Sequence, residues 1–280
     1  MQRPFGWTGV EVPVIGQGTW QMGGRPGEEA QALLRGVELG LTHIDTAELY
    51  GAAEDVVGAV VRARRRDELF LVSKVMPQHA DRRGTVAACE RSLKKLGTDH
   101  LDVYLLHWQG EQPLEESMRG LQACLDAGKT RFVGVSNLHV AELEICLAAL
   151  GPTRLACNQV YYDLEHRGIE RRLLPWCQER GIALVGYSPF GSSPARIPGP
   201  DTAGGRVLAE VAAAHGVTAA QVILAFLTRL PGTFTIPRAA RRAHVEDNAA
   251  ASRLRLSAGE VEAIDRAFPA PERDGPLAML

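Results

Sequence analysis

The chain has 280 residues, of which 45% are hydrophobic, and a formal net charge of −2 at pH 7. This length allows one large α/β barrel or two smaller domains, and the small net charge argues against electrostatic binding to nucleic acid or anionic lipid. No apolar run approaches the ~20 residues of a membrane span, and the N-terminus lacks a signal-peptide core, so we expect a cytoplasmic protein that binds neither nucleic acid nor membrane.

The cysteines and histidines indicate neither disulfides nor a metal. Five cysteines are an odd number, and they contain no C-x-x-C pair. They are more typical of small buried side chains in a reducing compartment than of a disulfide framework. The eight histidines contain no His-x-His pair and no carboxylate-rich cluster at ligand spacing, so no metal site is expected.

Short apolar runs alternate with amphipathic stretches along the chain. A small hairpin is predicted at residues 4–13, with its turn at Thr8 and Gly9. The predicted strands lie at residues 14–19, 42–46, 69–74, 101–107, 132–137, 156–160, 183–188 and 233–237. The predicted helices lie near residues 28–39, 53–65, 84–96, 114–127, 140–149, 169–180, 206–229 and 241–254. We expect the longest of them to break at Gly216, with Thr218 capping its second half.

Eight strands, each followed by a helix, predict a (β/α)8 TIM barrel rather than an open sheet. No linker-like stretch divides the chain, so a single domain over residues 1–280 is expected, with the hairpin closing the barrel bottom. Residues 190–205 are rich in Gly, Pro and Ser and follow a strand end, which would place this loop on the catalytic face.

The C-terminal ends of the predicted strands all carry polar or aromatic side chains. Those residues are Trp20, Asp45, Lys74, His107, Asn137, Gln159, Tyr187 and Arg238. Each alone has an ordinary structural explanation, such as a capping carboxylate or a core histidine. In a barrel these ends converge on one face, and their occurrence in strand order indicates an active site.

Lys74 ends a buried apolar run, where a charge is costly unless it is paired or functional. Tyr50 follows the strand of Asp45, and a free phenol with a pKa near ~10 is a poor acid at neutral pH. A nearby ammonium would stabilise the phenolate and lower that pKa. Asp45 would keep the ammonium charged, and His107 could offer an N–H to a carbonyl oxygen, so the four residues suit proton donation to a carbonyl.

Eight segments, taken in order, resemble the aldo-keto reductases, from the hairpin to about residue 256. They are residues 16–20, 43–51, 72–74, 105–108, 134–137, 158–160, 187–189 and 236–238. The resemblance implies an NADPH-dependent oxidoreductase that reduces aldehydes and ketones to alcohols by hydride transfer, with NADH also possible. Tyr50 would be the general acid, and Asp45, Lys74 and His107 would complete its catalytic tetrad.

The resemblance also implies residues for cofactor and substrate. Ser136, Asn137 and Gln159 would hold the nicotinamide carboxamide, and Tyr187 would stack on its ring. The remaining implied cofactor contacts are Thr19, Trp20, Asp45, Ser188, Pro189, Gly191, Arg238, His244, Asp247 and Asn248. The implied substrate pocket comprises Trp20, Tyr50, His107 and Trp108, and takes a small carbonyl compound.

Some positions depart from the family pattern. Arg238 stands where the family usually has lysine, Ala239 lacks the following hydroxyl, and His244 replaces an arginine. NADPH remains the expected cofactor because arginine can bind a phosphate through two hydrogen bonds. The connection after Trp108 and the tail after Pro269 are both short, so fewer residues are expected to wall the pocket.

Two other functions stay open at this point. Lys74 could be the nucleophile of a Schiff-base aldolase on the same barrel. Alternatively, the protein could be a cofactor-binding regulatory subunit with little turnover, as the potassium-channel β-subunits of this family suggest. No extension that could serve as an interaction arm precedes the hairpin, which favours the enzyme, and a monomer is expected.

Overall fold

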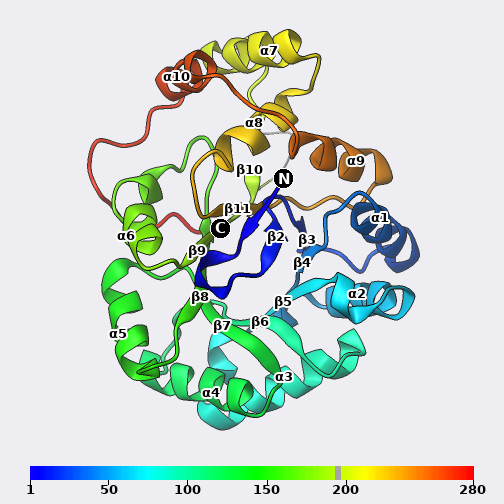
Figure 1. The fold of residues 1–280 in the computed structure, drawn as a ribbon, viewed down its shortest axis with the longest axis vertical. Coiled ribbons are helices and arrows are strands. Elements are labelled where there is room, and N and C mark those ends of the chain that lie inside the picture. The colour runs from blue at the N-terminus through cyan, green and yellow to red at the C-terminus, as the bar shows by residue number, and fades with distance from the viewer. Residues whose placement is uncertain (193–196) are drawn as a thin grey trace.

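The computed structural model describes residues 1–192 and 197–280, and its core is a barrel of parallel strands (Figure 1). The strands are β3 (Gln17–Gly18), β4 (His43–Asp45), β5 (Phe70–Val75), β6 (Leu101–Leu106), β7 (Thr130–Ser136), β8 (Leu155–Tyr161), β9 (Ala183–Tyr187) and β11 (Thr233–Ile236). Neighbours in the sheet follow chain order. Parallel bridges between Ile15 and Thr235 and between Gly18 and Arg238 join the last strand to the first. The predicted (β/α)8 fold is confirmed.

Helices surround the barrel, as Figure 1 shows. They are α1 (Pro26–Glu38), α2 (Ala53–Ala63), α3 (Arg82–Leu96), α4 (Leu114–Asp126), α5 (Val140–Leu150), α6 (Leu173–Glu179), α7 (Ala203–His215), α8 (Ala219–Leu227), α9 (Arg242–Ala251) and α10 (Ala258–Ala267). Short 3-10 turns are η1 (Gly6–Thr8), η2 (Glu48–Tyr50), η3 (Arg66–Glu68), η4 (Pro77–His79) and η5 (Gly168–Glu170). The predicted break between α7 and α8 is confirmed: Gly216 has φ 63°, and Thr218 caps α8 in a reciprocal pair with Gln221.

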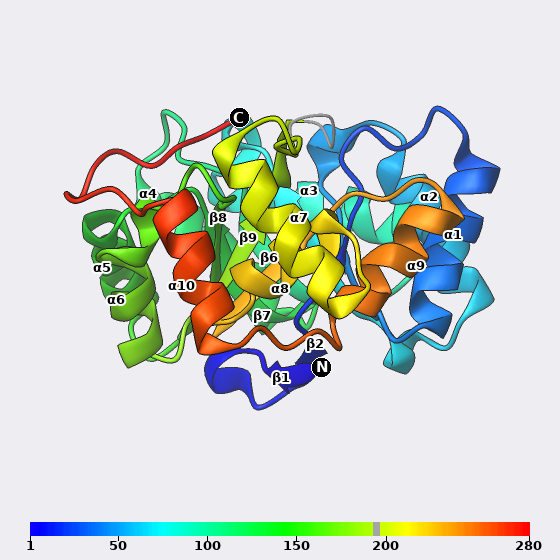
Figure 2. The ribbon, with the colours of Figure 1, turned by 90° about the horizontal axis from the view of Figure 1, so that it is seen from above.

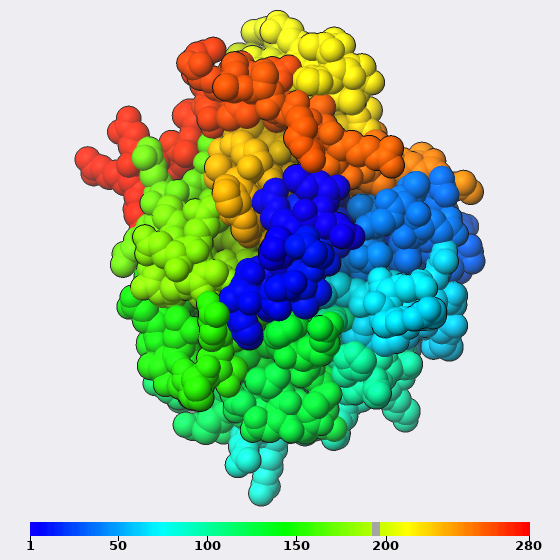
Figure 3. Space-filling model, in the orientation of Figure 1, coloured from blue at the N-terminus to red at the C-terminus, as the bar shows by residue number. Residues whose placement is uncertain are grey.

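The N-terminal hairpin lies across the end of the barrel opposite the strand C-termini (Figures 2 and 3). It pairs β1 (Gln2–Pro4) with β2 (Glu11–Pro13), and Gly9 adopts a left-handed conformation in the turn. The Phe5 ring packs 4.9 Å from the Phe70 ring and 5.0 Å from the Phe234 ring. The hairpin therefore closes the barrel bottom, as predicted, and its Phe5 ring packs into that end of the barrel.

Strand alternation decides which side chains enter the barrel. Val72 packs in the interior cluster with Phe5, whereas Ser73 points outward and donates to Glu54 of α2 at 2.9 Å. Because side chains alternate along a strand, Lys74 returns to the interior. At the end of β5 its side chain is fully buried, and its bonds to the Asp45 carboxylate and the Thr46 carbonyl offset the cost of placing an ammonium inside the barrel.

Some boundaries differ from the sequence prediction. Helix α10 was not predicted, although Ser257 and Glu260 form a capping box at its start. The predicted loop 190–205 includes the short strand β10 (Pro189–Ser192) and the first turn of α7, while its residues 193–196 lie outside the described residues. β3 is shorter than predicted because the chain pairs there only locally with β4.

Two simpler features of the chain complete the fold. All five cysteines are free and buried, as predicted: Cys89, Cys124, Cys146, Cys157 and Cys177. In the described parts of the chain no single helix is long and apolar enough to cross a membrane. Helices α7 and α8 would reach that length only as a pair, and they bend by 97° at their junction.

Candidate active site

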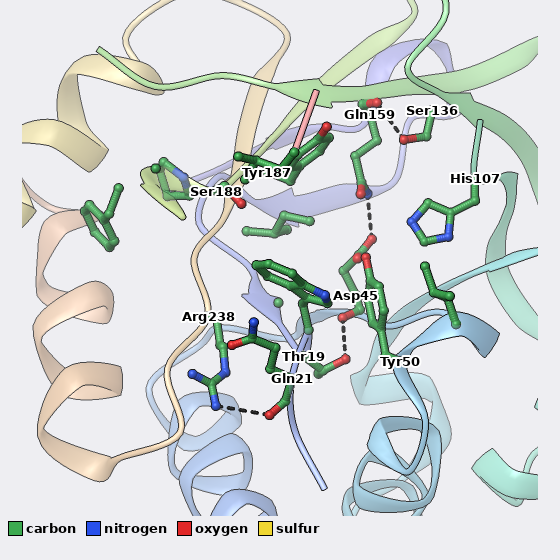
Figure 4. A pocket seen from close by; sticks show the side chains of 18 of the residues that line it. Thr19, Gln21, Asp45, Tyr50, His107, Ser136, Gln159, Tyr187, Ser188 and Arg238 are labelled. Atoms are coloured by element: carbon green, nitrogen blue, oxygen red, sulfur yellow. Dashed lines mark hydrogen bonds between the residues drawn. The ribbon is translucent and has the colours of Figure 1, made fainter. Parts of the chain in front are cut away.

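A pocket of about 550 Å³ opens at the C-terminal ends of the strands (Figure 4). It is lined by most of the residues that the sequence singled out: Thr19, Trp20, Asp45, Tyr50, His107, Trp108, Ser136, Asn137, Gln159, Tyr187, Ser188, Pro189, Gly191, Arg238 and His244. Residues far apart in sequence meet here because parallel barrel strands end on one face.

Lys74 lies behind the pocket wall and binds two of the lining residues. Its Nζ donates to the Asp45 carboxylate and lies 3.4 Å from the Tyr50 hydroxyl oxygen. A third bond, to the Thr46 carbonyl, is 2.9 Å long. Burial alone would lower the pKa of Lys74, but Asp45 and Tyr50 together raise it above its ordinary value. The side chain is therefore a charged ammonium aimed at a phenol.

The Tyr50 hydroxyl is protonated at neutral pH. Burial raises the pKa of Tyr50, and the Lys74 ammonium opposes that rise without cancelling it. The sequence-based expectation of a lowered pKa was therefore wrong for the net shift, although the predicted effect of Lys74 has the right sign. Burial was underestimated because Tyr50 lies in the short turn η2, where periodicity says nothing about depth.

His107 stands beside Tyr50, with the two rings in an edge-to-face arrangement at 5.6 Å. The side chain is buried, and burial together with the Lys74 charge lowers the pKa of His107 to about 2. The imidazole is therefore neutral at neutral pH and carries a single N–H. A phenol and a neutral imidazole thus flank the same part of the pocket (Figure 4).

Amide and hydroxyl groups form a connected network next to the tetrad. Gln159 Nε2 donates to Asp45 Oδ2 at 2.7 Å, and Ser136 Oγ donates to the Gln159 carbonyl at 2.8 Å. Asn137 Nδ2 donates to the Ser136 hydroxyl at 3.1 Å and to the His107 carbonyl at 3.2 Å. These bonds leave each side chain little freedom, so the polar wall is organised in advance of any ligand.

Tyr187 supplies the flat wall of the pocket. Its hydroxyl donates to Asn137 Oδ1 at 3.0 Å, and burial raises the pKa of Tyr187 to about 12. Behind it lies Tyr161, whose ring is nearly parallel at 14°, with centroids 5.6 Å apart. His166 stacks on Tyr161 in turn at 4.6 Å. The Tyr187 side chain is thus held at its hydroxyl by Asn137 and on one ring face by Tyr161.

Two arginines and a histidine lie at the other end of the pocket. Arg238, Arg241 and His244 all line it, and Arg238 donates to the Gln21 carbonyl at 3.2 Å (Figure 4). Among the described residues that line the pocket, only Asp45 has an acidic side chain, and Lys74 already pairs with it. This end can therefore accept an anionic group.

Backbone strain coincides with the pocket. The described chain has three non-glycine residues with positive φ, namely Gln21 (61°), Asn137 (59°) and Ser188 (52°). All three line the pocket. Such conformations persist where the surrounding structure holds them, and they cluster at binding sites.

Two predicted cofactor residues lie outside the pocket wall. The Asp247 carboxylate accepts the Thr218 hydroxyl at 3.1 Å, and Asn248 is buried in α9. Sequence reasoning missed other lining residues, namely Gly18, Gln21, Leu49, Ile236, Ala240, Met279 and Leu280. Met279 and Leu280 belong to an irregular tail without a periodic pattern, so nothing in the sequence places them there. The tail is short, as noted from the sequence, and its last two residues still contribute to the pocket wall.

Comparison with known proteins agrees with this geometry. The model of the Aldo/keto reductase family matches residues 14–268. The chain belongs to this family. The resemblance found from eight short segments is thereby confirmed.

Individual family members are similar over almost their whole length. "Methylglyoxal reductase YeaE" of Escherichia coli is 43% identical over 97% of this chain and 96% of its own. "Glyoxal reductase" of Bacillus subtilis is 33% identical over 96% of this chain and 93% of its own. An aldo/keto reductase from Klebsiella pneumoniae, solved in complex with NADP and acetate, has a TM-score of 0.90 and 42% identity, covering 98% of both chains.

Proposed function

We propose that this aldo/keto reductase is an NADPH-dependent oxidoreductase that reduces aldehydes and ketones to alcohols. The observation that carries the proposal is the contact of one buried ammonium, Lys74, with both the Asp45 carboxylate and the Tyr50 hydroxyl at the pocket wall. Two relatives are named as reductases of methylglyoxal and glyoxal, so small dicarbonyl compounds are the first substrates to test.

Tyr50 is the proposed general acid. Its hydroxyl is protonated at neutral pH and faces the pocket, where it can donate to a carbonyl oxygen as negative charge develops there. Lys74 stabilises the phenolate that remains, and Asp45 keeps Lys74 charged. The neutral His107 can place its N–H on the same carbonyl oxygen, which orients the substrate and stabilises the developing charge.

The chemistry of the lining residues fits NADPH. Hydrogen-bonding side chains at Ser136, Asn137 and Gln159 suit the carboxamide, and the flat Tyr187 ring suits stacking on the nicotinamide. Arg238 and Arg241 supply positive charge for the phosphates. When bound, NADPH supplies the hydride for the carbonyl carbon. Thr19, Ser188, Pro189, Gly191 and His244 are further proposed cofactor contacts, with Asp247 and Asn248 proposed near the adenine.

The substrate end of the pocket is proposed to lie between Trp20 and Trp108. Both line the pocket near Tyr50 and His107, and Trp20 is 39% exposed. Apolar rings beside the proton donor exclude water around the carbonyl without fixing one particular substituent. This arrangement supports a range of neutral aldehydes and ketones.

The two alternative functions are not supported. A Schiff-base lysine must be a neutral amine that reaches its substrate, whereas Lys74 is fully buried and charged. The relatives reported above are named as reductases rather than as regulatory subunits. We further propose a single domain over residues 1–280 and a monomer in the cytoplasm, which light scattering and cell fractionation would test.

An assay of carbonyl compounds with both cofactors tests the proposed function. Methylglyoxal, an aromatic aldehyde, a simple ketone and a keto acid are supplied with NADPH or NADH, and the absorbance of the reduced nicotinamide is followed. We expect carbonyl-dependent oxidation of NADPH, fastest with aldehydes. Tight NADPH binding without turnover on any compound would contradict the proposal and favour a regulatory subunit, and a borohydride-trapped adduct on Lys74 would favour an aldolase.

A further inference from the structure

A carboxylate outside the pocket binds the turn that carries Tyr50 to the segment that carries Lys74. Glu48 begins η2, and its side chain is only 9% exposed. It is not among the described residues that line the pocket. Its Oε1 accepts the backbone N–H of Met76 at 2.6 Å. Met76 lies two residues beyond Lys74, so this bond joins the two parts of the chain whose side chains meet at the Tyr50 hydroxyl.

Two further side chains hold the Glu48 carboxylate from the solvent side. His79 Nδ1 lies 3.1 Å from Oε1, and Arg91 Nη2 donates to Oε2 at 3.3 Å. Because both oxygens are engaged, the Glu48 side chain has one favourable orientation. That orientation directs Oε1 at the Met76 N–H.

Other contacts within and beside this segment also hold Tyr50: its N–H donates to the Ala47 carbonyl at 3.0 Å, and its ring lies edge-to-face with His107. Thr46 is tied to β5 by its N–H, which donates to the Val72 carbonyl at 2.9 Å, and by its own carbonyl, which accepts from Lys74. Leu49 is 43% exposed and makes no comparable attachment. Tyr50 itself reaches β5 through the 3.4 Å contact with Lys74. Among the described residues, the bond from Glu48 is thus the hydrogen bond to the β5–Met76 segment that lies nearest before the proposed proton donor.

We propose that Glu48 is a positioning residue for proton transfer, holding the Tyr50 hydroxyl against Lys74 by binding the Met76 N–H. This inference rests on the proposed role of Tyr50 as general acid. A displacement of about 1 Å at a reacting group can cost ~100-fold in rate. The proposed cofactor contacts Ser136, Gln159 and Tyr187 lie on other strands, so loss of Glu48 changes the chemical step and leaves cofactor binding in place.

Single substitutions give the first test. Turnover at saturating NADPH and aldehyde, NADPH affinity and thermal stability are measured for Glu48→Ala and Glu48→Gln. We expect Glu48→Ala to lose about 10- to 100-fold in kcat, with NADPH affinity unchanged. Glu48→Gln should fall between wild type and Glu48→Ala, because its amide oxygen still accepts the Met76 N–H. The matched control is Glu116→Ala, which removes a carboxylate that binds the Arg82 N–H and Arg119 and is absent from the described pocket wall, and it should keep wild-type kcat.

A double substitution separates positioning from general stability. If Glu48 acts through Tyr50, adding Glu48→Ala to Tyr50→Phe should lower the residual rate by less than twofold. The inference would be overturned if Glu48→Ala lowered the rate of Tyr50→Phe by as large a factor as it lowers the rate of wild type. A kcat within twofold of wild type for Glu48→Ala alone would also overturn it. Tyr50→Phe alone tests a different claim. Near-normal turnover of that variant would show that Tyr50 is not the general acid, an outcome distinct from a negative result for Glu48.

Discussion

Lys74 Nζ lies 3.4 Å from the Tyr50 hydroxyl oxygen while it is bound to the Asp45 carboxylate. Two features of this site, burial and the neighbouring ammonium, act on the pKa of Tyr50 in opposite directions. Burial raises the pKa of Tyr50 and keeps the phenol protonated, whereas the ammonium lowers it and makes proton release possible. A general acid needs both, because it must hold its proton at neutral pH and give it up during the reaction.

Replacement of Lys74 by methionine should therefore slow reduction and change its pH dependence. Lys74→Met keeps the aliphatic stem but removes the charge that lowers the pKa of Tyr50, and it leaves Asp45 unpaired. We expect turnover to fall by about 10²-fold or more. Alcohol oxidation, which requires the phenolate, should need a higher pH than in wild type. Initial rates in both directions across pH would measure this.

Lys129→Met is the matched control, since Lys129 pairs with Glu90 on the outside of the barrel. It should leave both rates and their pH profiles unchanged. A near-normal rate with an unaltered pH profile in Lys74→Met would show that Lys74 is only structural.

Arg238 should distinguish NADPH from NADH. NADPH carries a 2′-phosphate that NADH lacks, and we propose that Arg238 binds it. A charge-assisted hydrogen bond contributes roughly 1.5–3 kcal/mol. Arg238→Ala should weaken NADPH binding by about ten- to a hundredfold and leave NADH nearly unchanged. Fluorescence titration with both cofactors measures the two affinities. Arg242→Ala is the control, because Arg242 pairs with Glu246 at 3.0 Å and is absent from the described pocket wall; equal losses of both cofactors in Arg238→Ala would contradict the assignment.

Tyr161 should support cofactor binding from behind the pocket wall. Its ring stacks on Tyr187, and an aromatic pair contributes about 0.5–1.5 kcal/mol. Tyr161→Leu should weaken NADPH binding by about two- to tenfold, because Tyr187 loses the aromatic ring that stacks on it. Tyr161→Phe keeps the ring and removes only the hydroxyl that donates to Asp163, so it should bind NADPH almost as wild type does. Similar losses in both variants would mean that the Asp163 bond matters and the stacking does not.

His43 should make the fold sensitive to acid. It is fully buried at the barrel bottom, neither ring nitrogen has a hydrogen-bond partner among the described residues, and burial lowers its pKa to about 4. Between pH ~6.5 and ~4 the unfolded chain holds a proton on His43 that the folded protein lacks, so the free energy of unfolding falls as pH falls. The difference amounts to roughly 3 kcal/mol over that range.

Urea unfolding at several pH values tests this effect. His107, with its pKa lowered to about 2, adds a fall of the same sign that extends to lower pH. His43→Leu should therefore reduce the slope of stability against pH between ~6.5 and ~4 without abolishing it. An identical slope in the variant and the wild type would contradict the assignment to His43.

The sequence predicts those parts of this site that lie on strands. Alternation along β4 and β5 places Asp45 and Lys74 inside the barrel, and the order of the strands brings them to one face. Contacts from irregular segments are not predictable in this way. Leu49, Gln21 and the tail residues near Leu280 reach the pocket through backbone paths that no periodic pattern encodes.

Long-range partners explain the remaining differences between prediction and structure. Asp247 is proposed near the adenine from its spacing, and its carboxylate also accepts the Thr218 hydroxyl at the start of a neighbouring helix, a partner that the spacing does not predict. The net pKa shift of Tyr50 depends on how deeply the turn is buried, which is a property of the packed structure. Such competition between a local motif and a tertiary partner appears only when the elements are packed together.

The most direct test of the proposed function is the turnover of Tyr50→Phe with saturating NADPH and aldehyde. The substitution removes a single hydroxyl, and the proposed cofactor contacts on the other strands remain. The predicted result is NADPH affinity near that of wild type and a loss of about 10²- to 10⁴-fold in reduction. Retention of more than about a third of wild-type turnover, with the fold intact, would contradict Tyr50 as the general acid.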